Sequence, residues 1–172
     1  MGIDKTVEDL RVRVQRLEDE SAIRRLMSEI LQKADDRDYP QWGERIVDYY
    51  TDDGQWKSVA GFADVGMSER GKPALIKKFT TGTRICESSH LLGSESIDVQ
   101  GEEANGSWLC FEPATLKGHG ETREPVWIMG RYMVEFRRSE GRWKVRTMQY
   151  EGIFCTPYDK GWIDQRFVSI AR

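Results

Sequence analysis

The sequence predicts an α+β domain in which helices come first and a curved antiparallel sheet follows. Two observations carry this prediction. Before residue 36, apolar residues recur at spacings of three and four, which is the period of an amphipathic helix. From residue 86 onward the apolar period changes to two, and turn residues divide this part into four strand-length stretches. Because helices and strands are segregated along the chain, we expect the sheet to wrap around the N-terminal helices.

Two apolar stripes of different phase predict two helices at the start of the chain. The first stripe predicts a helix over 5–18 and consists of Val7, Leu10, Val14 and Leu17. The second follows the capping residues 19–21 and predicts a helix over about 21–36 with Ile23, Leu26, Met27, Ile30, Leu31 and Ala34. The first stripe is narrow and lies near a chain end, so it packs either on its own domain or on a neighbouring subunit.

The stretch between the second helix and residue 86 predicts shorter elements. Pro40 disfavours helix at Tyr39 and therefore ends the second helix. We then expect a helix over 41–50, a turn at 51–54, a strand at 55–59, an irregular glycine-rich segment at 60–71, and a helix over 72–81 that begins near Pro73.

Four strands are expected near 87–99, 104–116, 124–138 and 142–154. The turn compositions at 101–103 and 139–142 predict hairpins, and 117–121 predicts a longer hairpin tip. The clearest alternation places one strand face at Val126, Ile128, Gly130, Tyr132, Val134 and Phe136. Arg131 belongs to the opposite face, which could contact another subunit.

The length and charge of the chain restrict its function. Its 172 residues fit one domain, in which residues 1–20 form an N-terminal helical extension. The net charge is −3, and the 26 basic and 29 acidic residues are well mixed, so no basic stripe points to nucleic acid. No apolar run approaches the roughly 20 residues that cross a bilayer, so we expect no membrane association.

The N-terminus and the cysteines indicate the compartment. The N-terminus is polar and charged from Asp4 onward and has no signal-peptide pattern, so we expect a cytoplasmic protein. Cys86, Cys110 and Cys155 are widely spaced and odd in number, which is typical of reduced core residues and not of a disulfide framework. No pair of cysteines or histidines has the spacing of metal ligands, so we expect no metal site.

Two residues are candidates for proton transfer. His90, one of only two histidines, lies in a strand-like run of apolar and small residues at 88–94. Its unperturbed pKa lies near neutrality, so a nearby carboxylate can make it a general acid or base. Asp35 lies at the C-terminal end of a predicted helix, where the macrodipole disfavours a negative charge unless the carboxylate has a partner. The other histidine, His119, lies between two glycines and is predicted to be an exposed loop residue.

Four segments carry a family resemblance. They are Tyr49-Tyr50-Thr51-Asp52-Asp53-Gly54-Gln55-Trp56, Gly71-Lys72-Pro73-Ala74-Leu75, Ser88-Ser89-His90, and Gly141-Arg142-Trp143-Lys144-Val145. With these segments in this order, the chain from about Glu20 to Trp162 resembles the SnoaL-like branch of the NTF2-like superfamily. The resemblance implies a cone-shaped α+β barrel, a reaction without a cofactor, and a homo-oligomer, for which a trimer is favoured.

Within that branch the chain is similar to cofactor-free lyases. They include hexachlorocyclohexane dehydrochlorinase, bile-acid 7α-dehydratase, scytalone dehydratase and a diaryl-deformylating lyase. These enzymes use an Asp–His pair inside the cone, and the two positions are filled here by Asp35 and His90. The bile-acid dehydratases carry a tyrosine about where Ile30 stands and an arginine about where Gly152 stands, so a bile-acid substrate is not implied.

The resemblance implies a proton-transfer mechanism for these two residues. Neutral His90 would remove a proton from carbon, while Asp35 would accept a hydrogen bond from the other ring nitrogen and fix the tautomer. Water, halide or formaldehyde would then leave with help from a hydrogen-bond donor. The candidate donors are Tyr50, Tyr132, Tyr150, Arg131 and Arg146. Arg146 and Tyr150 are expected to share a strand face from which Tyr150 reaches the cavity.

The aromatic content suggests what the substrate is. Six Trp, six Tyr and six Phe are enough to build a flat-walled pocket. The expected pocket residues are Tyr49, Trp56, Phe79, Trp108 and Trp127. We therefore expect a hydrophobic, aromatic small molecule, of which lignin-derived diaryl compounds are one class. Two alternatives stay open: a non-catalytic small-molecule-binding module, and an isomerase or cyclase for polyketide- or steroid-like substrates, whose product would keep the substrate's mass.

Overall fold

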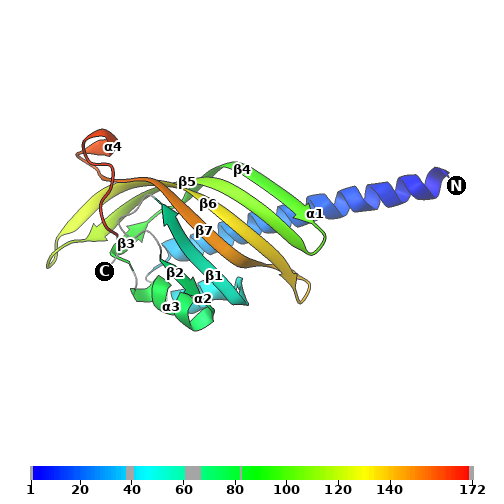
Figure 1. Ribbon diagram of the computed structural model, residues 1–172, viewed down its shortest axis with the longest axis horizontal. Coiled ribbons are helices and arrows are strands. Elements are labelled where there is room, and N and C mark those ends of the chain that lie inside the picture. Colours follow the sequence, from blue (N-terminus) through cyan, green and yellow to red (C-terminus); the bar gives the residue numbers. More distant parts are fainter. Residues whose placement is uncertain (1, 38–40, 61–66, 82, 171–172) are drawn as a thin grey trace.

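A computed structural model of the chain describes residues 2–37, 41–60, 67–81 and 83–170. Figure 1 labels the helices and strands found in these residues. In chain order they are α1 (Gly2–Asp35), α2 (Trp42–Val47), β1 (Tyr50–Ala60), β2 (Ser68–Arg70), α3 (Lys72–Thr81), β3 (Ile85–Ser88), β4 (Leu91–Gln100), β5 (Glu103–Lys117), β6 (Arg123–Ser139), β7 (Arg142–Pro157) and α4 (Gly161–Asp164).

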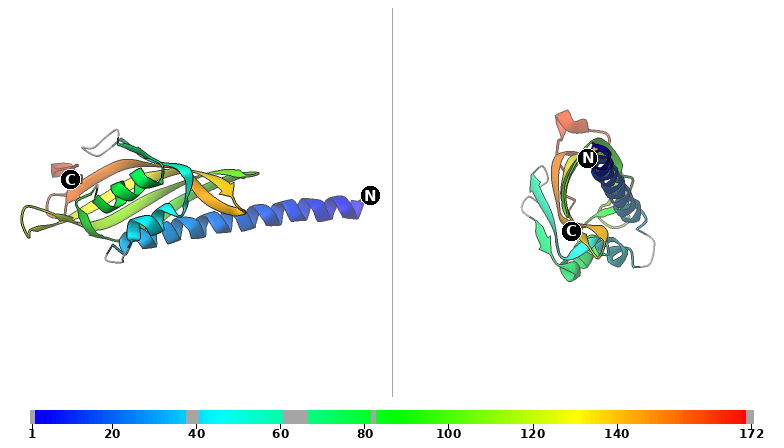
Figure 2. Two further views of the ribbon diagram at one scale, coloured as in Figure 1. Left: turned by 90° about the horizontal axis from the view of Figure 1, so that it is seen from below. Right: turned by 90° about the vertical axis from the view of Figure 1, so that its right-hand side faces the viewer.

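The sheet curls strongly around one side of α1 and forms a half-barrel, which confirms the expected α+β architecture (Figures 1 and 2). The strand order is β2-β1-β7-β6-β5-β3, and β4 also pairs with β5. Neighbouring strands are antiparallel except β1 and β7, which run parallel. This one departure is possible because β1 and β7 are far apart in sequence, so no hairpin forces them to run in opposite directions.

The first two predicted helices are one unbroken helix, α1. The predicted break at 19–21 is wrong, because Asp19 stays helical and accepts hydrogen bonds from Arg138 and from Trp143 Nε1. The change in phase between the stripes therefore marks a change in what the helix faces. From Ile23 onward the apolar stripe is buried under the sheet, whereas residues 4–18 are all exposed and project beyond it (Figure 1). None of the described helices is both long and apolar enough to cross a bilayer.

The segment before β1 also differs from the prediction. The helix over 41–50 is shorter than expected, and the predicted turn at 51–54 is an irregular part of β1. The turn-forming residues coincide with a register shift between β1 and β7. Tyr50 pairs with Val145, but Gln55, five residues later, pairs with Thr147, only two residues later. The short strand β2 was not predicted. The predicted helix end at 39–40 and residues 61–66 of the glycine-rich segment lie outside the described residues, whereas the helix at 72–81 is confirmed.

The three long strands follow the predicted alternation closely. Inward residues of β6 such as Val126, Ile128 and Phe136 are buried, and they join the inward residues of β5 and β7 in one core under α1. The β6–β7 hairpin has a two-residue turn in which Glu140 and Gly141 have φ of 52° and 73°. Two positive φ values are what a type I′ hairpin turn requires, so the predicted turn at 139–142 is confirmed.

Asp19 fastens α1 to the sheet, and we expect Asp19→Asn to lower the free energy of unfolding at pH 7 by about 2 kcal/mol. Burial alone raises the pKa of Asp19, but hydrogen bonds from Arg138 and Trp143 and the charge of Arg138 outweigh it and hold the pKa below 3.8. The contribution of Asp19 is therefore present above about pH 4 and is lost as the pH falls through the folded-state pKa.

Urea unfolding of both proteins at neutral and acidic pH checks this prediction. The difference in free energy should shrink at acidic pH. A suitable control is Glu8→Gln, because Glu8 forms a fully exposed pair with Arg11 and its loss should cost less than about 1 kcal/mol. Equal effects of the two substitutions would show that Asp19 does not fasten the helix.

Candidate functional site

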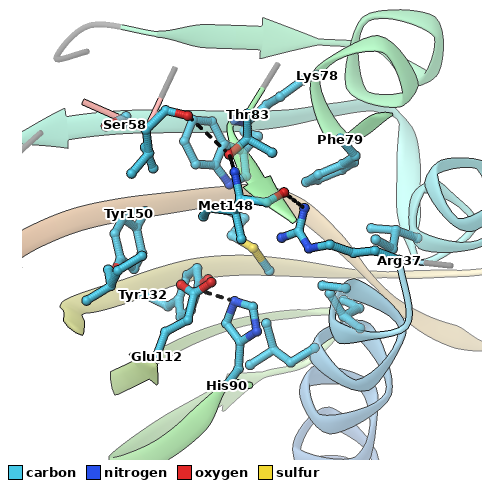
Figure 3. Close-up of a pocket in the computed structure, with 18 of the residues that line it drawn as sticks. Arg37, Ser58, Lys78, Phe79, Thr83, His90, Glu112, Tyr132, Met148 and Tyr150 are labelled. Carbon is cyan, nitrogen blue, oxygen red and sulfur yellow. Dashed lines mark hydrogen bonds and ion pairs between the residues drawn. The ribbon is translucent and has the colours of Figure 1, made fainter. Parts of the chain in front are cut away.

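A cavity of about 130 Å³ lies between the helices and the concave face of the sheet (Figure 3). Helices α1, α2 and α3 form one wall, and strands β1, β5, β6 and β7 form the other. Its apolar lining includes Ile30, Leu31, Ile46, Phe79, Ile128 and Met148. Its polar and charged lining includes Arg37, Ser58, Lys78, His90, Glu112, Tyr132 and Tyr150.

Asp35 holds both the ring and the backbone of His90. Its Oδ1 lies 2.6 Å from His90 Nδ1, and the backbone N–H of His90 donates to Oδ2 at 2.9 Å. The Ser88 hydroxyl also donates to Oδ1, at 3.0 Å. These three contacts stabilise a carboxylate at the last residue of α1, where the helix dipole alone would disfavour it. The two candidate residues, 55 positions apart in sequence, are therefore within hydrogen-bond distance of each other.

The same contacts explain why the strand expected at 87–99 is two strands. β3 ends at Ser88 and β4 begins at Leu91, although both pair with β5. The backbone N–H of His90 donates to Asp35 and not to a neighbouring strand, so the ladder is interrupted at this point. The interruption places the imidazole at the cavity wall, with its side chain only 6% exposed.

Glu112 is a second carboxylate beside His90, and the sequence analysis missed it. It lies on β5, and its Oε2 is 3.5 Å from His90 Nε2, the contact drawn as a dashed line in Figure 3. The Glu112 side chain is 7% exposed, and its Oε1 has no hydrogen-bond partner among the described residues. The imidazole therefore lies between two carboxylates, one at each ring nitrogen.

The sequence did contain a signal for Glu112. This residue has the same strand phase as the inward residues of β5, which are Ala104, Trp108, Cys110, Ala114 and Leu116. A charged residue in a buried series is rarely tolerated without a partner or a function. Its phase in the predicted strand at 104–116 would have placed it opposite the helices.

The two carboxylates determine the ionisation of His90. Burial alone lowers the pKa of His90, but the charge of Glu112 and the hydrogen bond and charge of Asp35 outweigh it and raise the pKa above 6.5. Burial alone raises the pKa of Asp35, but the hydrogen bonds and charge of His90 outweigh it and hold the pKa below 3.8. Because His90 Nε2 and Glu112 Oε2 lie 3.5 Å apart, a proton can pass between the two groups.

Arg37 brings a cation to the same cavity and was also missed. Its Nη1 donates to the carbonyl oxygen of Ile85 at 3.3 Å, and its guanidinium carbon lies 5.1 Å from the centre of the Trp42 ring. Its Nε is buried and has no hydrogen-bond partner among the described residues. Burial lowers the pKa of Arg37, but an arginine keeps its charge in proteins. Arg37 therefore offsets part of the negative charge of Asp35 and Glu112.

Five of the ten predicted substrate-binding residues line the cavity: Tyr50, Trp56, Phe79, Tyr132 and Tyr150. The Tyr132 and Tyr150 rings pack 4.8 Å apart, and Tyr150 lies against Gly130, where a Cβ would come within 2.3 Å of the tyrosine ring. Burial raises the pKa of both tyrosines well above 10, so they stay protonated donors. Tyr50 instead donates to the sulfur of Met148 at 3.3 Å.

Three aromatic residues expected in the pocket lie elsewhere. Trp108 is buried in the core, and its Nε1 donates to Glu95 at 3.0 Å. Tyr49 faces α1, where its hydroxyl donates to Glu29 at 3.0 Å. Trp127 lies on the outer face of β6, stacked against another outer-face ring. The alternation of β6 already placed Trp127 opposite the inward residues, so aromatic type alone was a poor guide to pocket position.

The two arginines expected to assist the leaving group also lie outside the cavity. Arg131 is exposed on the outer face of β6, as its strand phase indicated. Arg146 lies at a bulge of β7, because the residues before and after it pair with consecutive residues of β6. A bulge changes the phase of a strand, so Arg146 does not share the face of Tyr150 and instead reaches Glu103.

The site offers acid–base chemistry in a largely apolar enclosure. His90 Nε2 can accept a proton, and the neighbouring His90 and Glu112 side chains can return one. The tyrosine hydroxyls and the guanidinium of Arg37 can donate hydrogen bonds. Among the described residues, no three His, Cys, Asp or Glu side chains are placed to hold a metal ion.

Comparison with known proteins identifies a family for most of the chain. A family model described as a SnoaL-like domain matches residues 15–149. No curated protein matches the chain.

Solved structures from several proteins share the fold. Hexachlorocyclohexane dehydrochlorinase LinA-type3 from Novosphingobium barchaimii LL02 is 21% identical over 84% of this chain and 93% of its own, with a TM-score of 0.70. A protein provisionally named a scytalone dehydratase, from Novosphingobium aromaticivorans DSM 12444, is 20% identical over 83% and 89%, with a TM-score of 0.66. Another from Novosphingobium aromaticivorans, provisionally named an aromatic ring hydroxylase, is 20% identical over 82% and 94%, with a TM-score of 0.67. At these identities the likeness shows the fold alone.

Proposed function

We propose that this chain, which belongs to the SnoaL-like domain family of the NTF2-like superfamily, is a cofactor-independent lyase. It eliminates water, halide or formaldehyde from a hydrophobic, aromatic small molecule, with His90 as the base and Asp35 as the residue that orients it. The observation that carries the proposal is the 2.6 Å contact between Asp35 and a buried imidazole whose other nitrogen faces the cavity. Two structural neighbours named for eliminations, a dehydrochlorinase and a dehydratase, support a reaction of this type.

The elimination balances with the groups that line the cavity. Asp35 accepts the Nδ1 proton of His90, so Nε2 is the ring nitrogen that takes a proton from a substrate carbon. For loss of water or halide, the electron pair of that carbon–hydrogen bond forms the double bond, and the leaving group departs with the electrons of its own bond. For loss of formaldehyde, Nε2 instead takes the hydroxyl proton of a hydroxymethyl group, and the oxygen–hydrogen electron pair forms the carbonyl bond of formaldehyde. The electron pair of the broken carbon–carbon bond stays on the other carbon, which takes the proton back from the imidazolium. The Glu112 carboxyl is the acid we assign, and it gives a hydroxyl leaving group the proton with which that group departs as water. After loss of water, the imidazolium returns a proton from Nε2 to Glu112 across the 3.5 Å gap, which restores the starting state. After loss of halide, it releases the proton to solvent.

The cavity size favours a particular kind of substrate. An apolar cavity of about 150 Å³ is enough to bind benzene, and this cavity has about 130 Å³. One six-membered ring is therefore about the most that the cavity can enclose, and we expect it beside His90, where Trp56 and Phe79 also line the wall. The second ring of a diaryl substrate would lie toward the partly exposed border at Thr83 and Ile170. The ring that carries the reacting carbon is the one we expect to be buried.

Mass spectrometry of compounds incubated with the protein tests this function. A library of lignin-derived, steroid and polyketide compounds should contain a substrate that loses water, halide or formaldehyde. A product of unchanged mass would favour an isomerase or cyclase instead. Binding of a compound without any chemical change would favour a non-catalytic binding module, and both results would contradict the lyase.

A further inference from the structure

The first apolar stripe of α1 has no partner within its own subunit. Val7, Leu10, Val14 and Leu17 are 42%, 50%, 52% and 63% exposed, in a segment whose residues from 4 to 18 are all exposed. Figures 1 and 2 both show this part of the helix extending beyond the sheet. Four large aliphatic side chains on one face of a projecting helix are typical of a helix–helix contact surface.

The stripe faces away from the domain. With 3.6 residues per turn, its mean direction lies about 150° around the helix from the buried stripe that begins at Ile23. The positions that would continue it toward the domain are the exposed polar residues Ser21, Arg24 and Ser28. The contact surface is thus confined to the projecting part of the helix, and a partner can reach it without meeting the sheet.

We propose that this stripe pairs with the same stripe of a second copy of the chain, as a short parallel two-stranded coiled coil. The spacing Val7, Leu10, Val14, Leu17 follows a heptad with valine at a and leucine at d. β-Branched residues at position a combined with leucine at position d favour a coiled coil of two parallel helices.

The charges beside the stripe fit a parallel pair in register. In this heptad Arg13 occupies position g and Glu18 position e of the next heptad, so Arg13 of each helix lies beside Glu18 of the other. Within the described part of the chain, neither residue forms an ion pair. An arginine therefore lies beside a glutamate of the other helix on each side of the apolar contact.

The projecting helix need not form on its own. Isolated helices of fewer than about 12–15 residues are marginal in water because nucleation is unfavourable. Here the buried second half of α1 is held by the sheet and by Asp19, so the projecting turns extend an existing helix. Pairing therefore does not have to nucleate a new helix.

Sedimentation equilibrium of the full chain tests the pairing. The wild-type protein should contain an even number of subunits, and Leu10→Glu should weaken the association by at least about 100-fold, since each copy loses a buried leucine. Val12→Glu is the matched control, because Val12 is 62% exposed on the same helix but lies outside the stripe. A simple trimer in the wild-type protein, or equal effects of the two substitutions, would overturn the proposal.

Two further variants test the direction of the helices. Arg13→Glu and Glu18→Arg should each weaken the association, and the double variant should restore it because opposite charges meet again. In a parallel pair Leu17 lies opposite its own copy, so Leu17→Cys should form an intersubunit disulfide under mild oxidation that the wild-type protein does not form. Absence of this cross-link in a protein that still associates would exclude the parallel arrangement.

Discussion

His90→Ala is expected to lower kcat/KM by about 100- to 10,000-fold, the range in which a general base contributes. His90 is the residue at the cavity wall whose ring is fixed by Asp35 and whose second nitrogen is left for proton transfer. The measurement is the rate of product formation with a substrate identified by mass loss. Full activity in this variant would end the proposal that the Asp35–His90 pair carries the chemistry.

The variant should still fold, so the loss of activity can be attributed to the ring. Asp35 would keep two of its three hydrogen bonds, from the Ser88 hydroxyl and from the backbone N–H of residue 90. Circular dichroism should therefore show an unchanged fold. His119→Ala is the matched control, because His119 is exposed on the β5–β6 hairpin and its loss should leave kcat/KM unchanged.

The stability difference between wild type and His90→Ala should depend on pH in a defined direction. The folded-state pKa of His90 is raised above 6.5, so its contribution is complete below 6.5 and is lost as the pH rises through the folded-state pKa. The folded-state pKa of Asp35 is lowered below 3.8, so its contribution is lost as the pH falls through that value. Urea unfolding should therefore show a larger difference at about pH 5.5 than at about pH 8.5.

The sequence predicted best those elements whose pattern is repeated many times. The strands at 104–116, 124–138 and 142–154 each carry a long alternation, and β5, β6 and β7 extend them by at most a few residues. The false break in α1 came from a local signal, since residues 19–21 have capping composition but Asp19 is used to bind the sheet. Tertiary contacts decided that case, and they are not visible in a window of a few residues.

In the site, too, local sequence pattern predicted some features, whereas others depend on tertiary contacts. The pairing of Asp35 with His90 followed from the family resemblance, because nothing in a single sequence brings together residues 55 positions apart. The position of Arg146 was wrong because one extra residue in β7 reverses the strand phase. Glu112 was missed for a different reason: its strand phase was available, but the predicted pocket was built from aromatic residues. A charged residue on a buried strand face was the more informative signal.

Glu112→Gln is expected to have the second largest effect, and the size of that effect should depend on the leaving group. Glutamine has nearly the same shape but cannot donate an acidic proton, so the loss of a hydroxyl group should slow by about 100-fold or more. A halide leaves as an anion and needs no proton, so its elimination should change little. Rates measured on a matched pair of hydroxyl and halide substrates check this difference. Glu87→Gln, an exposed carboxylate on β3, is the control.

The same variant should shift the pH profile of kcat/KM. The charge of Glu112 is one of the causes that raise the pKa of His90, so its removal should lower that pKa. With a halide substrate, which needs no acid, His90 must only be unprotonated to act as the base, so the acidic limb of that profile should move to lower pH in Glu112→Gln. Unchanged profiles and rates for both leaving groups would show that Glu112 takes no part in proton transfer. Because Asp35 holds the other ring nitrogen, that result would leave the Asp35–His90 pair intact as the base and would assign the acid to Tyr132 or Tyr150.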